Sequence, residues 1–204
     1  MKAFERPPPY RLLNRFFGES LVERLLAHAD KRKGDFTPSL VGGVALNRTF
    51  RVSQVLRDFE DLRPELEARF IAILDDTVRE LKLSPINLAP LELELAAHGE
   101  GAFFKEHIDT ATDSAAVHSS RALTGVYYFH REPKGFTGGE LRLSGIAPAA
   151  DGERRSVVIP PAPDSLLLFP SWAPHEVHPI SCPSGEFMDS RFAINCWYRH
   201  RWTD

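Results

Sequence analysis

The chain contains the stretch LELELAAHGEGAFFKEHID at residues 91–109, where the character of the sequence changes. From here onward, short strand-like segments are separated by turns rich in Gly, Pro and Asp, which is typical of a β-sandwich or β-barrel. The stretch holds two such segments, 91–97 and 102–107, and ends on His-Ile-Asp. Residues two apart on a strand project to the same side, so His107 and Asp109 can hold one metal ion together.

Further segments of this kind fill the rest of the chain. The strands that we predict lie near residues 91–97, 102–107, 121–130, 139–144, 155–160, 165–169, 175–180 and 190–200. Eight strands suit a jelly roll, the double-stranded β-helix, which leaves few exposed edges. Two stretches rich in Pro, Ala and Gly, 145–152 and 160–164, fit loops between strands. We therefore expect a jelly-roll core over about residues 91–200.

The part of the chain before this core shows helical spacing. After an entry strand over residues 10–17, apolar residues recur at helical spacing between Gly18 and Gly34, and again from Pro64 to Leu83. The charged faces of these helices are interpreted as their solvated sides. We expect a helical brace over about residues 1–90 that supports one sheet, which makes the fold mostly β (α+β).

Composition narrows the class of protein. With 204 residues, the chain is long enough to bury roughly 70% of its unfolded surface in one domain, residues 1–204. A net charge of −3 gives no global positive field, so we expect no nucleic-acid partner. No apolar run has the length of a signal peptide or a membrane helix, which favours a cytoplasmic protein without membrane contact. Cys182 and Cys196 lack metal-site spacing, and Cys196 is predicted to be a core residue.

Two later segments add candidates for binding a metal and an anion. Segment 169–177 contains His175, and His178 lies on the opposite strand face, so only one of the two histidines can point inward. Two histidines and a carboxylate suit non-haem Fe(II), which keeps positions open for a co-substrate and O₂. Arg191 begins the last strand, and a buried guanidinium needs a carboxylate partner. The alternative for Arg191 is an ion pair with Asp189.

The order of these motifs resembles the 2-oxoglutarate- and Fe(II)-dependent dioxygenases, specifically the prolyl 4-hydroxylase-like branch. His-x-Asp is followed by Gly-Gly-Glu-Leu at 138–141, then by the second histidine and the arginine, and the resemblance covers about residues 91–197. It implies that His107, Asp109 and His175 bind Fe(II), because the family pattern His-x-Val-x-Pro selects His175. The two glycines are interpreted as a tight entry into a strand.

The resemblance also implies a site for 2-oxoglutarate, in which Arg191 anchors the distal carboxylate. A tyrosine hydroxyl joins this contact, and Tyr128 rather than Tyr127 is expected to reach the pocket if Thr124 does, because these two share a strand face. Either tyrosine can instead be a core aromatic. Many relatives carry a co-substrate-binding tyrosine nine residues before the first histidine. This chain has His98 there, which either takes over that hydrogen bond or leaves it absent.

The function implied is hydroxylation of an unactivated C–H bond with release of succinate and CO₂. The cofactors are Fe(II), 2-oxoglutarate and O₂, with ascorbate as an optional addition. Asp109 favours hydroxylation, since a small residue there leaves a coordination position for halide. The substrate stays open between a prolyl residue of a peptide or protein and a free amino acid or other small molecule. Two alternatives are a cupin-like metal-dependent isomerase or hydrolase without 2-oxoglutarate, and a non-catalytic jelly-roll binding module.

The substrate entrance and the oligomeric state are less defined. Lys105, Arg121 and Trp172 lie beside the predicted ligand segments, and they belong either to a substrate entrance or to ordinary surface. The sequence does not indicate an oligomeric state.

Overall fold

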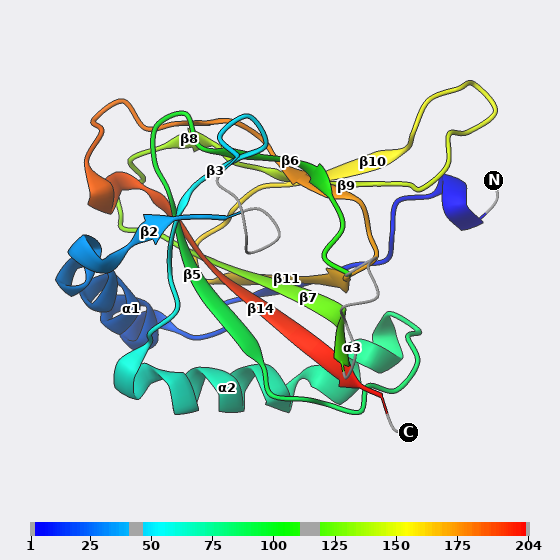
Figure 1. The fold of residues 1–204 in the computed structure, drawn as a ribbon, viewed down its shortest axis with the longest axis horizontal. Helices are drawn as coiled ribbons and strands as arrows, with labels where there is room; N and C mark the ends of the chain where they lie inside the picture. The colour runs from blue at the N-terminus through cyan, green and yellow to red at the C-terminus, as the bar shows by residue number, and fades with distance from the viewer. Residues whose placement is uncertain (1–2, 41–46, 111–118, 203–204) are drawn as a thin grey trace.

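The computed structural model describes residues 3–40, 47–110 and 119–202, and these residues form two facing antiparallel sheets with helices on the outer side of the larger one (Figure 1). The larger sheet has the order β1 (Arg11–Asn14), β11 (Ser165–Pro170), β7 (Ser119–Phe129), β14 (Arg191–Arg201), β5 (Glu92–His98), β4 (Gln54–Leu56), β2 (Thr37–Pro38). The smaller sheet has the order β10 (Ser156–Ile159), β9 (Leu141–Ser144), β12 (His175–Val177), β6 (Phe103–His107), β3 (Arg51–Val52). This arrangement confirms the predicted mostly β jelly roll.

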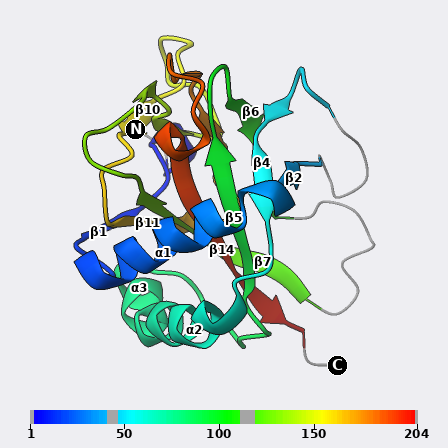
Figure 2. The same cartoon turned by 90° about the vertical axis from the view of Figure 1, so that its left-hand side faces the viewer.

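The remaining elements connect or cover these sheets. They are the pair β8 (Thr137–Gly138) and β13 (Ile180–Ser181), the helices α1 (Glu19–Lys31), α2 (Arg63–Ala72) and α3 (Leu74–Glu80), and the 3₁₀ turns η1 (Ala3–Glu5), η2 (Lys33–Asp35), η3 (Glu60–Leu62) and η4 (Phe187–Asp189). Figure 2 shows α1 and α2 side by side against the larger sheet. In the part of the chain that the structure describes, every helix is too short or too polar to cross a membrane.

Strand alternation divides the core into two layers. Along β7, Leu123 and Tyr127 point toward the helices, whereas Val126 and Tyr128 point toward the smaller sheet. The same alternation holds in β14, where Cys196 is a free, fully buried thiol on the helix side, as predicted. From Thr124 to Tyr128 in β7 and from Arg191 to Trp197 in β14, the face between the sheets therefore carries the even positions of β7 and the odd positions of β14.

The predicted helix from Pro64 to Leu83 is wrong as a single element. The structure breaks it at Ile73, which separates α2 from α3 and has φ −102° and ψ 0°. The hydroxyl of Thr77 donates to the Ile73 carbonyl at 2.7 Å, and Arg11 donates to Thr77 at 2.8 Å. A threonine that bonds back to the preceding turn is known to bend helices, and here the threonine is also held by Arg11 from a distant strand, which apolar spacing does not reveal.

The expected helical brace over residues 1–90 is also incomplete. Besides the predicted entry strand, which appears as β1, this part of the chain supplies β2 and β4 to the larger sheet and β3 to the smaller one. These strands have two or three residues each, too few to show alternation. The predicted strand at 175–180 is likewise divided, into β12 and β13. The strands β4 and β2 extend the larger sheet beyond β5, and β3 extends the smaller sheet beyond β6.

Candidate metal centre

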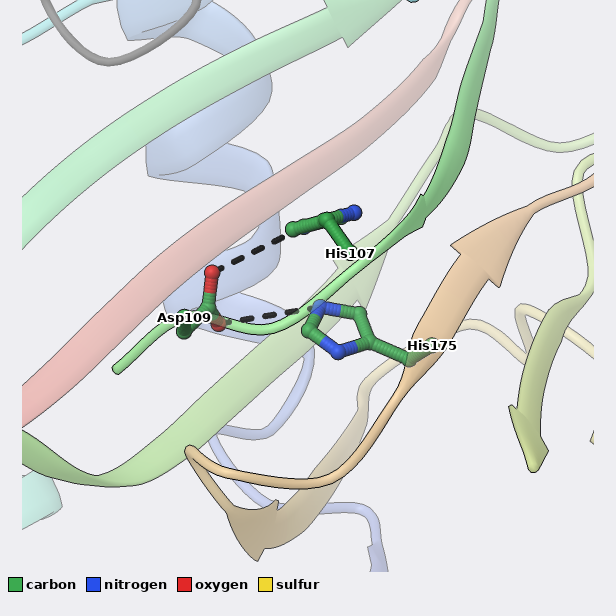
Figure 3. A group of neighbouring side chains, drawn as sticks. All are labelled: His107, Asp109 and His175. Atoms are coloured by element: carbon green, nitrogen blue, oxygen red, sulfur yellow. Dashed lines mark ion pairs between the residues drawn. The ribbon is translucent and has the colours of Figure 1, made fainter. Parts of the chain in front are cut away.

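Three of the predicted residues meet between the sheets, at the end of β6 and the start of β12. His107 and His175 lie directly opposite each other in the β6–β12 pair, and Asp109 follows β6 (Figure 3). The Nε2 atom of His107 lies 3.6 Å from Oδ1 of Asp109, and the Nε2 atom of His175 lies 3.6 Å from Oδ2. One ligand atom from each residue falls within 4.8 Å of the others, a spacing at which they can hold one metal ion.

The histidine tautomers suit a metal. Nδ1 of His107 lies 2.8 Å from the Lys105 carbonyl, and Nδ1 of His175 lies 2.9 Å from the Ala173 carbonyl. A carbonyl only accepts, so each Nδ1 carries the proton and each Nε2 presents a lone pair. Two lone pairs and the carboxylate of Asp109 therefore converge with no proton between them. A cation satisfies this donor set, and the backbone carbonyls are the outer partners that usually orient metal-binding histidines.

Asp109 is firmly held. Its side chain is 7% exposed, and its Oδ2 accepts hydrogen bonds from the Thr124 hydroxyl at 2.8 Å and the Trp197 indole at 2.9 Å. Burial raises the pKa of Asp109, but neighbouring His175, His107 and Arg121 outweigh it and keep the pKa well below the usual range. Burial also lowers the pKa of His175 to about 4. Both groups are thus in their metal-binding protonation states at neutral pH.

A second group of polar residues lies deeper between the sheets, around Arg191. This residue begins β14, pairs with His98 in β5 and is 1% exposed. Its Nη1 donates to Nδ1 of His98 at 3.3 Å, whereas Nε and Nη2 are buried without a hydrogen-bond partner among the described residues. The Tyr128 hydroxyl is buried and unpartnered in the same way, and the guanidinium lies 4.7 Å from the centre of its ring.

The protonation states and neighbours of this group favour an anion. Burial, together with the charges of Arg191 and Arg51, holds the pKa of His98 well below its usual value, so His98 is a neutral acceptor. Burial also lowers the pKa of Arg191. The alternative partner Asp189 is engaged elsewhere, with Arg131 and with the Ser184 hydroxyl at 2.6 Å. Among the described residues, His98 is the acceptor for Nη1, and Nε and Nη2 of Arg191 are left without one.

One cavity connects the metal-binding group to the Arg191 group. It is lined at one end by His107, Asp109 and His175 and at the other by Arg191 and His98. Its remaining walls are a mixed set, Arg51, Phe104, Thr124, Val126, Leu141, Val177, Asn195 and Trp197. A ligand that enters this cavity can touch both ends.

Strand alternation also concerns the side on which Tyr128 and His178 lie. Tyr128 lies between the sheets next to Arg191 but does not itself line the cavity, whereas Tyr127 points the other way and donates to Asp164 at 2.8 Å. His178 is not brought to the cluster, because its side chain is 31% exposed and pairs with Glu176 at 3.3 Å and Glu140 at 3.6 Å.

The Gly138-Gly139 pair is required by close packing. Both residues have φ +74°, a region that favours glycine. A Cβ on Gly139 would lie 2.7 Å from Cδ of Arg191 and 2.8 Å from Cγ1 of Ile180. The second glycine therefore leaves room for the stem of Arg191.

Sequence reasoning missed several residues of the site. Asn195 and Trp197 share the strand face of Arg191, and this alternation is the signal that could have assigned them to the same cavity. Arg51 gave no signal, because it lies in a two-residue strand; it is nearly buried and donates to Glu94 at 2.9 Å. Ser171 was also missed, and its carbonyl accepts from the Asp109 backbone at 2.9 Å.

Fold and site together define a jelly-roll protein in which two histidines and one carboxylate converge near a buried arginine. The model of the 2OG-Fe(II) oxygenase superfamily matches residues 93–199, and the chain belongs to this family, whose members use Fe(II) and 2-oxoglutarate. The resemblance inferred from the sequence is thereby confirmed.

Individual relatives lie in the prolyl hydroxylase branch. Over 202 residues the chain is 33% identical to an uncharacterised PKHD-type hydroxylase of Synechocystis sp., covering 96% of this chain and 64% of that protein, so the chain spans less than two thirds of the relative. Its fold is similar to a Pseudomonas putida prolyl-4-hydroxylase, with TM-score 0.67 and 25% identity over 94% of this chain and 92% of the other.

A further solved structure shares the fold alone. It is a Trichoplax adhaerens prolyl hydroxylase in complex with a peptide fragment of a hypoxia inducible factor oxygen degradation domain. The TM-score is 0.66 and the identity 23%, over 93% of this chain and 82% of that one.

Proposed function

We propose that the chain is a Fe(II)- and 2-oxoglutarate-dependent hydroxylase. The observation that carries this proposal is the Arg191 guanidinium, which is buried with two nitrogens unpaired beside the unpaired Tyr128 hydroxyl. Burying such a group without a partner is costly, and its donor fork matches a carboxylate. A dicarboxylate that reaches from this anchor to the metal-binding residues along one cavity accounts for both ends of the site.

His107, Asp109 and His175 would hold the iron through two Nε2 atoms and one carboxylate oxygen. When bound, the iron supplies the O₂ chemistry that oxidises an unactivated C–H bond while 2-oxoglutarate is converted to succinate and CO₂. The three protein donors leave positions for the 2-oxo acid and for O₂. Thr124 and Trp197 hold the carboxylate of Asp109 in place.

Arg191 and Tyr128 would bind the distal carboxylate of 2-oxoglutarate. His98 supports this contact in two ways: it occupies Nη1 of Arg191, and its neutral ring adds no charge to the pocket. The arginine is thereby oriented with Nε and Nη2 available. The apolar side chains of Val126 and Leu141 in the cavity wall exclude water from the bound co-substrate.

The substrate class is taken as a prolyl residue of a peptide or protein, or an amino-acid-like compound, with no nucleic-acid partner. The likeness to the Pseudomonas putida prolyl-4-hydroxylase and to the PKHD-type hydroxylase supports this choice. We place the activity in one domain over residues 1–204, because helices and larger sheet share one apolar cluster. The free cysteines Cys182 and Cys196 support a cytoplasmic location, where thiols stay reduced.

The two alternatives explain less. A cupin-like isomerase or hydrolase needs no carboxylate anchor, and a binding module needs no converging metal donors. Membership of the oxygenase family and the unpaired Arg191 both favour the hydroxylase.

The test begins with metal-free protein loaded separately with Fe(II) and with Zn(II). We expect succinate release from 2-oxoglutarate and O₂ with Fe(II) alone, stimulated by one class among end-blocked prolyl peptides and free amino acids. Succinate release that is absent under every condition would contradict the proposal. Turnover of a substrate by the Zn(II) protein without 2-oxoglutarate would support the cupin-like alternative instead.

A further inference from the structure

We propose that Arg121 is a positioning residue of the metal centre, which acts through the indole of Trp197 to fix the Asp109 carboxylate with a single oxygen presented to the metal. This inference rests on the proposed function, because it assumes that Asp109 is a metal ligand. It assigns Arg121, for which the sequence left open a place at the entrance or on the surface, to the support of that ligand.

The two oxygens of Asp109 have different surroundings. Oδ2 accepts from the Thr124 hydroxyl at 2.8 Å and from the Trp197 indole N–H at 2.9 Å, so its lone pairs are engaged. Oδ1 accepts no hydrogen bond from the described residues and faces Nε2 of His107 at 3.6 Å. The arrangement leaves Oδ1 as the oxygen available to a metal, provided that the indole keeps its position.

Arg121 holds the indole in that position. Its guanidinium carbon lies 3.7 Å from the centre of the Trp197 ring, a close cation–π contact. The guanidinium is itself fixed by Glu92, which accepts from Nε at 3.1 Å and also from Nη2. A positive charge over the ring draws electron density from the indole, which makes its N–H a stronger donor to Asp109. Arg199 also donates to Glu92, at 3.2 Å, but Arg121 has two hydrogen bonds of its own to that carboxylate.

If Arg121 acts through its charge, its removal should change the metal affinity in one direction, and if it acts by positioning the indole, in the other. Its Nη1 lies 3.8 Å from Oδ1 of Asp109, and a cation at that distance opposes the binding of a second cation. If Arg121 acted by charge alone, its removal would strengthen metal binding, and a lysine would behave like the arginine. If it acts by holding the indole, removal weakens metal binding, and lysine fails as well because it lacks the planar fork.

The experiment measures Mn(II) affinity of the metal-free protein by equilibrium titration, with the paramagnetic signal of free Mn(II) as the readout. We expect Arg121→Gln and Arg121→Lys to bind Mn(II) about tenfold more weakly, as is typical when an outer partner of a metal ligand is lost. Arg199→Gln is the matched control, since Arg199 contacts the same Glu92 and donates to Ser119, whereas Arg121 lies over the Trp197 ring and near Asp109. It should bind Mn(II) like the unsubstituted protein.

Trp197→Phe provides a second arm that does not depend on the folding of the Arg121 variants. It removes the N–H but keeps a ring, and should weaken Mn(II) binding to a similar extent. On that background, Arg121→Gln should add little, because both residues act through one hydrogen bond.

Several outcomes would overturn the inference. Equal or tighter Mn(II) binding by Arg121→Gln does so, as do full affinity in Arg121→Lys, full affinity in Trp197→Phe, and an equal loss in Arg199→Gln. If instead the unsubstituted protein binds no Mn(II), the proposed metal site is wrong, and this inference is then wrong as well. The two failures are therefore distinguishable.

Discussion

The two ends of the cavity are built in opposite ways. At the metal end, hydrogen bonds orient all three candidate ligands. Backbone carbonyls accept from His107 and His175, and a hydroxyl and an indole donate to Asp109. At the anchor end, Arg191 and Tyr128 are buried at least as deeply, yet both keep polar atoms without a partner. One end is complete except for a cation, and the other is complete except for an anion.

This difference shows how a folded chain indicates its ligands. A buried polar group without a hydrogen bond costs on the order of 1–3 kcal/mol, so it persists where something else satisfies it. At the metal end the missing partner is shown by converging lone pairs. At the anchor end it is shown by Nε and Nη2 of Arg191, which face no acceptor among the described residues. Four pairs of variants test whether the ends are as distinct as their geometry suggests.

The largest effect is expected at the metal end. His175→Ala should abolish turnover and weaken Fe(II) binding, because it removes one of three protein donors, as measured by succinate release and metal content. His178→Ala is the control on the same segment, and should leave both nearly intact, since its ring points to Glu176 and Glu140. Loss of iron in the His178 variant alone would identify the other histidine as the ligand.

The next effect concerns the anchor. Arg191→Met should raise the apparent requirement for 2-oxoglutarate by tens-fold or more, because a buried charge-assisted contact contributes about 2–5 kcal/mol. Arg191→Lys should recover only part of this, since an ammonium cannot reproduce the fork. An unchanged requirement in Arg191→Met would refute the anchor.

The thermal stability of Arg191→Met tests whether Arg191 serves the ligand or the fold. Without ligand, Arg191→Met should unfold at the same or a higher temperature, because it removes nitrogens that are buried without a partner. In the unsubstituted, Mn(II)-loaded protein, added 2-oxoglutarate should raise the unfolding temperature. In Mn(II)-loaded Arg191→Met it should not. A large loss of stability in the unliganded variant would show that Arg191 serves the fold rather than the ligand.

A smaller effect is expected from the glycine that accommodates Arg191. Gly139→Ala combines an unfavourable positive φ with a Cβ 2.7 Å from Cδ of Arg191, so it should lower stability by about 1–3 kcal/mol and raise the 2-oxoglutarate requirement several-fold. Gly152→Ala has a similar φ of +83° but nothing within 4 Å of its Cβ. This control should lose stability, but its 2-oxoglutarate requirement should stay unchanged. Equal co-substrate requirements in both variants would contradict the close approach to Arg191.

The smallest effect is expected from neighbouring tyrosines on opposite faces of β7. Tyr128→Phe should raise the 2-oxoglutarate requirement roughly fivefold, about 1 kcal/mol, without loss of unliganded stability, because its hydroxyl has no hydrogen-bond partner in the described part of the chain. Tyr127→Phe should lower stability and leave the 2-oxoglutarate requirement unchanged, since its hydroxyl donates to Asp164. Chemical denaturation and co-substrate titration of both variants measure the contrast. A shift in requirement for Tyr127→Phe alone would exchange their roles.

Strand alternation made much of this arrangement predictable from the sequence. A period of two residues sets which side chains share a face, so it separates Tyr128 from Tyr127 and places Arg191 with Trp197. The order of the motifs then pairs the His-x-Asp segment with the later histidine. Both signals are local or ordered along the chain, and both need no knowledge of how the strands are aligned.

What could not be predicted depends on contacts between distant segments. The helix break at Ile73 involves a hydrogen bond to Thr77 that is reinforced from Arg11 on β1. The stacking of Arg121 on Trp197 requires the alignment of β7 with β14, which has an irregularity after Tyr198. Neither spacing nor residue type specifies such alignment, so the support of Asp109 appears only in the folded chain.

The opposition of His107 and His175 across β6 and β12 has one further consequence. These strands are short, and their register is irregular between His175 and Val177, so few backbone bonds join them. A metal held by both imidazoles acts as a cross-strand staple at this weak point. Amide hydrogen exchange in β6 and β12 should therefore slow when metal binds, while exchange in the long β7–β14 pair stays nearly constant. In this protein, local opening of the smaller sheet and release of the metal would be one and the same event.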